Sequence, residues 1–272
     1  MPFPAAIAIA FAALIASFTA VWLVQLRTRN AGMIDPVWAA TLGTVAVFAA
    51  AVAPGDPVNR LFVAACGGIW GWRLGLHLWR RNAGHDEDYR YRALRDQWGA
   101  AAAQRMLGFF LLQAAVSVLL SLAFFVPAYQ AAPPTWIAVA LALVIWLASV
   151  TGEAAADRQL RRFLARPERA DRVCDEGWWR YSRHPNYFFE CLHSCAYAAW
   201  SLGRPWGWVT LAPPLLMGWL LLRVSGIPLL EAHLLESRAG YRDYMSRTSA
   251  LIPWPPRRSP ANPTTDSREP GP

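Results

Sequence analysis

Apolar runs of near-bilayer length recur along the whole chain. They cover residues 5–24, 37–53, 61–79, 106–128, 136–150, 188–202 and 206–222. A helix needs roughly 20 apolar residues to cross ~30 Å of hydrocarbon, and the shorter runs border Trp, Tyr or Pro, as interfacial ends often do. Only 16% of the residues are charged, well below the roughly 25% of soluble domains. The pattern predicts an all-α, polytopic membrane bundle of about seven transmembrane helices.

The arginines are distributed unevenly between the loops that join these runs. If the N-terminus lies outside, seven spans place on the inside residues 25–36, 80–105, 151–187 and 223–272. These segments contain all of the arginines except Arg60, Arg73 and Arg204, and lysine is absent. This is the positive-inside distribution, so we expect a multi-pass protein of a cell membrane, such as a bacterial inner membrane, with a cytoplasmic C-terminus. The net charge of +8 therefore reflects topology, and we expect membrane lipids rather than nucleic acid as partners.

Proline and polar clusters predict where the helices begin, bend and end. We expect Asp35 to cap the second span, with Pro36 in its first turn. The polar segment 82–105 predicts a short amphipathic helix on the membrane surface. The proline pair at 213–214 should bend or break the seventh span near its middle, and Pro228 should begin a further helix.

Charged side chains inside or beside an apolar span are costly and usually functional. Arg73 and His77 are four residues apart in the third span and therefore share one helical face. Arg73 could pair with a neighbouring acid and lock the packing, or it could line a polar cavity. Glu153, Asp157 and Arg161 form a charged stripe at the inner end of the fifth span. The stripe could be a solvated helix face, but Glu153 lies within a turn of the apolar run, which favours a binding role.

The densest cluster of polar and aromatic side chains covers residues 177–190. A helix should begin after Pro185, and four polar side chains then share a face that points to a polar interior, namely Asn186, Glu190, His193 and Tyr197. The amides at the start of this helix, with Arg180, Arg183 and His184, could form an anion site, for which phosphate is the natural ligand. The alternative is that these residues are interfacial aromatics and lipid-headgroup contacts.

Tyr241, Tyr244 and Arg247 predict a lid-like helix at the cytoplasmic mouth of the bundle. The four cysteines show no disulfide framework. Cys191 and Cys195 could ligate a metal, but small buried apolar side chains are the favoured interpretation, and no metal site is predicted. The sequence contains no Rossmann, P-loop or nucleophile-elbow motif.

Several short motifs, in order along the chain, resemble one family. Those in the C-terminal half are Ser182-Arg-His-Pro-Asn-Tyr187, Val224-Ser-Gly-Ile-Pro-Leu-Leu-Glu231, Gly240-Tyr-Arg-Asp-Tyr244 and Thr248-Ser-Ala-Leu-Ile-Pro-Trp254. Those in the N-terminal half are Asp35-Pro-Val-Trp38, Trp72-Arg-Leu-Gly-Leu-His77 and Glu87-Asp-Tyr-Arg-Tyr91. Over roughly residues 30–255 the chain resembles the bacterial membrane proteins related to the C-terminal domain of steroid 5-alpha-reductases. The Arg-His-Pro-x-Tyr element alone also occurs in isoprenylcysteine carboxyl methyltransferases and related phospholipid methyltransferases, which share a helical core and bind S-adenosylmethionine.

The resemblance implies a single membrane domain over residues 1–254 that binds NADPH between the spans and the cytoplasmic loops, mainly through about residues 151–254. Residues 255–272, rich in Pro, Arg, Ser and Thr, predict a disordered tail. Glu153 and Asp157 would contact the nicotinamide or ribose end of the cofactor. The phosphates and ribose would be held by Arg180, Tyr181, Arg183, His184, Asn186 and Tyr187, and the adenine side by His233, Tyr244 and Arg247.

The implied reaction is reduction of a carbon–carbon double bond conjugated to a carbonyl, in a steroid-like or isoprenoid substrate that enters from the bilayer. The steroid reductases polarise the carbonyl with a tyrosine that follows a histidine in the matching span, whereas here Leu78 follows His77. The catalytic candidates that could take its place are His77, Tyr89, Tyr91 and Glu190. An S-adenosylmethionine-dependent methyltransferase acting on a lipid or isoprenylcysteine-type substrate is the alternative, and a non-enzymatic lipid-binding or scaffold protein is a third class.

Overall fold

The computed structural model describes residues 1–169, 172–224 and 226–257. Within these residues the chain is helical, with one isolated β-bridge between Ser182 and Ser249 and no strand. The predicted all-α class is therefore confirmed. Most of the predicted disordered tail, residues 258–272, lies outside the described residues, as does Ser225.

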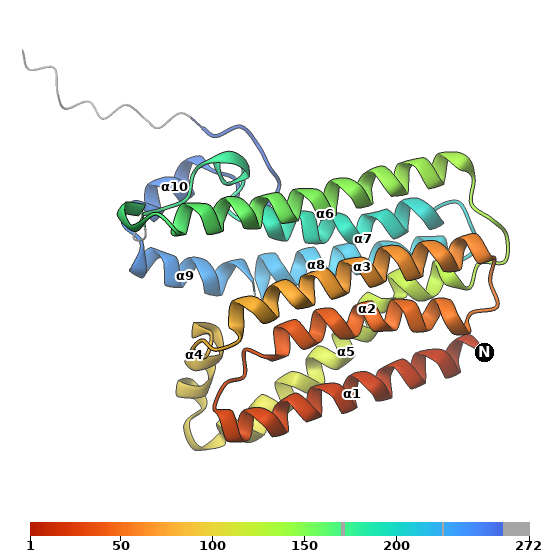
Figure 1. Ribbon diagram of the computed structural model, residues 1–272, viewed down its shortest axis with the longest axis horizontal. Coiled ribbons are helices and arrows are strands. Elements are labelled where there is room, and N and C mark those ends of the chain that lie inside the picture. Colours follow the sequence, from red (N-terminus) through yellow and green to blue (C-terminus); the bar gives the residue numbers. More distant parts are fainter. Residues whose placement is uncertain (170–171, 225, 258–272) are drawn as a thin grey trace, which may run out of the picture.

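Long helices run side by side along the molecule (Figure 1). They are α1 (Phe3–Thr28), α2 (Ile34–Val52), α3 (Pro57–Asn82), α5 (Ala102–Ala128), α6 (Trp136–Leu164), α7 (Pro185–Ser201) and α8 (Ala212–Arg223). The shorter α-helices are α4 (Tyr89–Trp98), α9 (Ile227–Ser237) and α10 (Tyr241–Arg247), and the 3₁₀ turns are η1 (Gly99–Ala101), η2 (Pro167–Arg169), η3 (Gly177–Arg180) and η4 (Gly207–Leu211). In Figure 1, α4, α9 and α10 lie at the end of the bundle opposite the N-terminus. The arginine-rich segments thus meet at one end of the molecule.

Six helical stretches in the described part of the chain are long and apolar enough to cross a membrane. They are α1, α2, α3, the run from α4 through α5, α6, and the run from η4 through α9. The remaining predicted span is α7, which has 17 residues, near the lower limit for a transmembrane helix. A membrane protein is supported on this basis, whereas the number of seven spans and the outside position of the N-terminus stay predictions.

Glycines allow α2 and α3 to approach backbone to backbone. A Cβ atom added at Gly71 would lie 2.5 Å from the Cα of Gly43 and 2.7 Å from the carbonyl oxygen of Ala39. One at Gly75 would lie 3.0 Å from the carbonyl oxygen of Pro36. Small residues at such crossings are typical of helix pairs in membranes, where close packing replaces the hydrophobic effect as the driving force.

The short polar segment forms the predicted surface helix, α4. Its N-terminus is capped by Asp88, whose side chain accepts a hydrogen bond from the amide of Arg90. Tyr91 is the buried residue of α4, and the helix lies across one end of the bundle (Figure 1). α4 therefore covers one end of the bundle, where it contacts α5 and is joined to α2 by hydrogen bonds with Asp35.

At two positions, residues that were predicted to cap or bend a helix stand elsewhere in the helix than expected. Asp35 does not cap α2, because this helix begins at Ile34 with Met33 at the N-cap and no side-chain cap. The proline pair at 213–214 does not bend a continuous α-helix; of the two predicted effects the structure shows a break, because the span 206–222 divides there into the 3₁₀ turn η4 and α8, and the prolines stand in the first turn of α8. Proline lacks the amide hydrogen that a helix start leaves unpaired, and this position is therefore the less costly one. Pro228 stands in the first turn of α9, as predicted.

Candidate functional site

A cavity of about 340 Å³ opens at the end of the bundle that carries α4 and α9. Its lining comes from α3, α4, α5, α6, α7, α8 and α9 and from the first turn of α2. Apolar side chains such as Leu112, Val116, Leu220 and Leu221 form the wall on α5 and α8. The polar wall consists of the polar side chains that line the cavity from α3, α4, α6 and α7, among them His77, Tyr89, Asp157 and Glu190. The size lies within the roughly 300–1,000 Å³ of small-ligand sites.

A larger cavity, about 690 Å³, lies at the opposite end, and its lining includes Phe3, Val126 and Trp206. Among its described lining residues there is no carboxylate and one cation, Arg204, which donates to Asn59 (3.1 Å) and to the carbonyl of Ala132. Its apolar walls suit a lipid chain. The titratable side chains gather at the smaller cavity, which is therefore the candidate functional site.

Ion pairs between α3 and α6 form part of the polar wall. Arg73 Nη2 lies 2.6 Å from Glu153 Oε2, and His77 Nε2 lies 3.5 Å from Asp157 Oδ2. His77 also contacts Arg161 through its other ring nitrogen, at 3.1 Å. Glu153, Asp157 and His77 line the cavity, and Arg73 lies behind that wall. Of the two possibilities for Arg73, the structure shows pairing with a neighbouring acid.

The polar face of α7 is divided between the cavity and the core. Asn186, Tyr187 and Glu190 line the cavity. His193 and Tyr197 lie deeper and are buried; they hydrogen-bond to each other at 3.2 Å, and His193 stacks on Trp70. Within the described residues the Glu190 carboxyl has no hydrogen-bond or ion-pair partner. Glu190 is therefore the carboxyl group that this wall can offer to a ligand.

The floor of the cavity is an acid–arginine–tyrosine cluster that joins α2 to α4. Tyr91 donates its hydroxyl hydrogen to Asp35 (2.6 Å), and Arg90 bridges Asp35 (2.7 Å) and Asp88 (2.9 Å). The hydrogen bonds from Arg90 lower the pKa of the Asp88 carboxyl, against the effect of burial, which would raise it. The motifs containing these residues were recognised in the sequence, but their contact was not predicted. Complementary charges on two segments that were both predicted to lie inside, residues 25–36 and 80–105, are the sequence signal for it.

The four catalytic candidates differ in whether their polar groups are engaged. His77 is paired with Asp157, and the Tyr91 hydroxyl donates to Asp35. Tyr89 lines the cavity and stacks on His233 of α9 with 4.3 Å between ring centroids. In the part of the chain that the structure covers, the Tyr89 hydroxyl, like the Glu190 carboxyl, has no hydrogen-bond partner. Leu78, at the position where the steroid reductases have a tyrosine, also lines the cavity.

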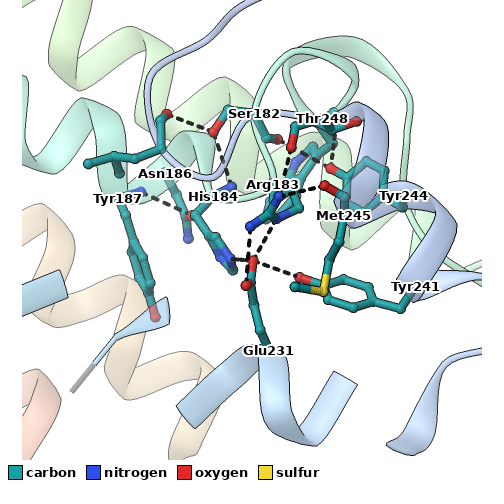
Figure 2. A network of polar contacts seen from close by, with 12 residues as sticks. Ser182, Arg183, His184, Asn186, Tyr187, Glu231, Tyr241, Tyr244, Met245 and Thr248 are labelled. Atoms are coloured by element: carbon teal, nitrogen blue, oxygen red, sulfur yellow. Dashed lines mark hydrogen bonds and ion pairs between the residues drawn. The ribbon is translucent and has the colours of Figure 1, made fainter. Parts of the chain in front are cut away.

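A second polar network surrounds the start of α7 (Figure 2). Arg183 binds both carboxylate oxygens of Glu231 (2.6 and 3.2 Å) and the backbone carbonyls of Thr248 (2.7 Å) and Met245 (3.0 Å). His184 Nε2 lies 2.9 Å from the same carboxylate. Burial lowers the pKa of His184 more than the Glu231 hydrogen bond raises it. Because a carboxylate oxygen accepts hydrogen bonds, His184 Nε2 carries the hydrogen in this contact and donates it to Glu231.

Tyr244 and Arg247 of the predicted lid helix, α10, also bind other groups of the protein. The Tyr244 hydroxyl donates to the backbone carbonyl of Trp179, and Arg247 pairs with Asp175 and Asp243, both at 3.1 Å. Arg180 and Tyr181 are exposed. The contacts with Trp179 and Asp175 fasten α10 to η3 and to the segment just before it.

The structure therefore separates the predicted cofactor residues into two groups. Glu153, Asp157, Asn186 and Tyr187 line the cavity, and His233 reaches it through its stack on Tyr89. The others belong to the network at the start of α7 or to the surface near it, namely Arg180, Tyr181, Arg183, His184, Tyr244 and Arg247. A residue that was not predicted, Arg81, lines the cavity and forms no ion pair in the described chain. In the same described residues, no cluster of His, Cys, Asp and Glu is arranged to hold a metal ion.

Comparison with known proteins gives one match. A family described as "Protein of unknown function (DUF1295)" matches residues 21–248. This range contains every residue that lines the smaller cavity, from Asp35 to Leu230. No curated protein and no solved structure gives a significant match.

Proposed function

The chain belongs to the family described as a protein of unknown function (DUF1295), and we propose that it is a membrane-embedded, NADPH-dependent reductase of a carbon–carbon double bond conjugated to a carbonyl. The observation that carries this proposal is a cavity lined both by apolar side chains and by carboxyl and amide groups. Such a site can hold a lipophilic substrate against a polar, hydride-donating ligand.

The apolar wall supports a lipophilic substrate that enters from the bilayer. Leu112 of α5 and Val224 after α8 line the cavity, and both are also exposed on the surface of the bundle. The cavity thus reaches the lipid-facing surface along these two helices. An isoprenoid or steroid-like chain would bury its apolar area there and exclude water from the polar wall.

The polar wall fits the nicotinamide and ribose end of NADPH. Glu153 and Asp157 offer oxygens that accept hydrogen bonds from ribose hydroxyls and a carboxamide, and Asn186 offers an amide. When bound, NADPH supplies a hydride. The phosphates need donors, and Arg81 is the arginine at the cavity rim without an ion pair in the described residues. Arg183 and His184 are engaged with Glu231, and they could contribute only if that contact opens.

Two side chains are placed to bind the carbonyl oxygen of the substrate. Glu190 and Tyr89 both line the cavity, and their polar groups lack partners in the described chain. A hydrogen bond to the carbonyl oxygen stabilises the negative charge that develops there. His77 and Tyr91 would first have to break contacts with Asp157 and Asp35, so Glu190 and Tyr89 are the better candidates.

The acidic wall also supports the alternative function. The sulfonium of S-adenosylmethionine is a cation, and carboxylates such as Glu153, Asp157 and Glu190 would attract it. A methyltransferase acting on a lipid or prenylated thiol is therefore the second candidate. The two ligands can be distinguished directly.

The test is a thermal unfolding titration of the detergent-purified protein with NADPH and, separately, with S-adenosylmethionine. A ligand at 100 times its Kd stabilises the folded state by ~2.7 kcal/mol, so we expect NADPH to raise Tm and S-adenosylmethionine to leave it unchanged. Asp157→Asn should weaken the NADPH effect, and Asp96→Asn, on the exposed face of α4, should not. Stabilisation by S-adenosylmethionine alone would overturn the reductase proposal.

A further inference from the structure

The carboxylate of Glu231 occupies an oxyanion-binding arrangement at the start of α7. Arg183 binds it with two nitrogens, at 2.6 and 3.2 Å, and His184 donates to it at 2.9 Å. The Tyr241 hydroxyl lies 3.4 Å from the same oxygen that His184 binds. Glu231 is 8% exposed. Figure 2 shows the carboxylate pointing into this group of donors.

The same donors would suit a phosphate group. Bidentate, charge-assisted bonds from arginine are the preferred recognition of phosphate as well as of carboxylate. The arrangement also lies at the N-terminus of α7, a 17-residue helix, where amide groups and the helix dipole favour negative charge. Glu231 thus takes the position that an external anion would need.

Glu231 belongs to α9, and α9 is also part of the cavity wall. Leu229 and Leu230 of this helix line the cavity. His233, two residues beyond Glu231, stacks on Tyr89, which lines the cavity from α4. α9 has 11 residues, so a change at Glu231 must move or loosen the same short helix that shapes the cavity.

We propose that Glu231 is an internal competitor for the anionic group of the ligand. An anion that binds Arg183 and His184 displaces the Glu231 carboxylate, and α9 is then released from its contact with the start of α7. Binding at the anion site and the shape of the cavity are thereby coupled, and the coupling acts equally in both directions. The identity of the anion, a phosphate of the dinucleotide, rests on the proposed function, whereas the competition itself rests on the contacts of Glu231.

Pyrophosphate is a suitable probe, because it carries the charge and oxygens of a dinucleotide bridge and has no nicotinamide. The full-length protein in detergent would be titrated with it, and Tm would be followed. Glu231→Gln keeps the size of the side chain and removes its charge, so we expect the midpoint of the titration to fall by roughly 5–150-fold, the usual range of coupling between two sites. The control is Glu236→Gln on the exposed face of α9, which should titrate like the wild type.

A second measurement does not depend on the stability of a variant. Hydrogen exchange of the wild-type protein should become faster in residues 227–237 when pyrophosphate is added, because the anion releases α9. An unchanged midpoint in folded Glu231→Gln, or exchange in α9 that stays the same or slows at saturating pyrophosphate, would refute the competition.

A titration with NADPH distinguishes a failure of this inference from a failure of the proposed function. If pyrophosphate behaves as expected but NADPH does not stabilise the protein, the competition holds and the reductase proposal fails. If NADPH stabilises wild type and Glu231→Gln with the same midpoint, the competition fails and the reductase proposal stands.

Discussion

At the scale of single residues, Glu190 differs from the other carboxylates of the cavity. Asp35 and Asp88 are bound by Arg90, Glu153 by Arg73, and Asp157 by His77. Glu190 lacks such a partner in the described chain. A carboxyl group without a partner among helices is costly and is usually functional. In the proposed function, this carboxyl group binds the substrate.

Glu190→Gln should therefore lower turnover strongly and affect the fold little. If the carboxyl exchanges a proton with the substrate, kcat should fall by roughly 10²–10⁴-fold, the usual contribution of a general acid or base, while stabilisation by NADPH is retained. The measurement is NADPH oxidation in the presence of a lipophilic enone, with Asp96→Asn as the surface control. Wild-type turnover by the Gln variant would exclude Glu190 from the chemistry and leave Tyr89 as the remaining unengaged candidate.

The helical spacing of polar residues predicted part of the site. Contacts between residues far apart in the sequence could not be predicted. Asn186 and Glu190 could be assigned to one inward face because they are four residues apart on a helix. The ion pair of Arg183 with Glu231 joins residues 48 positions apart, and no local pattern encodes such a contact. The same is true of Asp35 with Arg90 and Tyr91, which lie on separate helices, α2 and α4.

At the scale of elements, each of the seven apolar runs lies in a helical segment of the structure. The first and last residues of the helices were harder to predict. α6 continues to Leu164, beyond its apolar run, as the four-residue spacing of Glu153, Asp157 and Arg161 predicts. The proline pair at 213–214 marks the start of α8 rather than a kink. Whether proline starts or bends a helix depends on the chain before it, which the apolar pattern does not specify.

The contact between α2 and α3 gives a prediction about stability. Gly71→Leu would place Cβ 2.5 Å from the Cα of Gly43 and force the two helices apart, at a cost of ~1–3 kcal/mol or more. We expect a lower Tm and a lower folded yield in detergent, both measurable by fluorescence-detected gel filtration with heating. Gly108→Leu on α5 is the matched control, since a Cβ there meets nothing within 4 Å. Equal stability of the two variants would contradict the close packing of α2 on α3.

At the scale of the whole molecule, the arginine-rich segments and the titratable cavity lie at the same end of the bundle (Figure 1). Composition and apolar periodicity were sufficient to predict an all-helical membrane protein. The position of the cavity could not be predicted from them, because it depends on how eight helices from distant parts of the chain meet. That this end faces the cytoplasm stays a prediction of the positive-inside rule. A soluble cofactor such as NADPH would have to reach the site from that side.

The most direct test is to follow the hydride itself. The purified protein would be incubated with NADPH deuterated at the hydride-donating carbon and with a membrane lipid extract or a set of lipophilic enones, and the products analysed by mass spectrometry. We predict a reduced product that carries the deuterium at the carbon β to the carbonyl, with the second hydrogen taken from solvent. Absence of deuterium from every product, together with transfer of a labelled methyl group from S-adenosylmethionine to a lipid, would contradict the account.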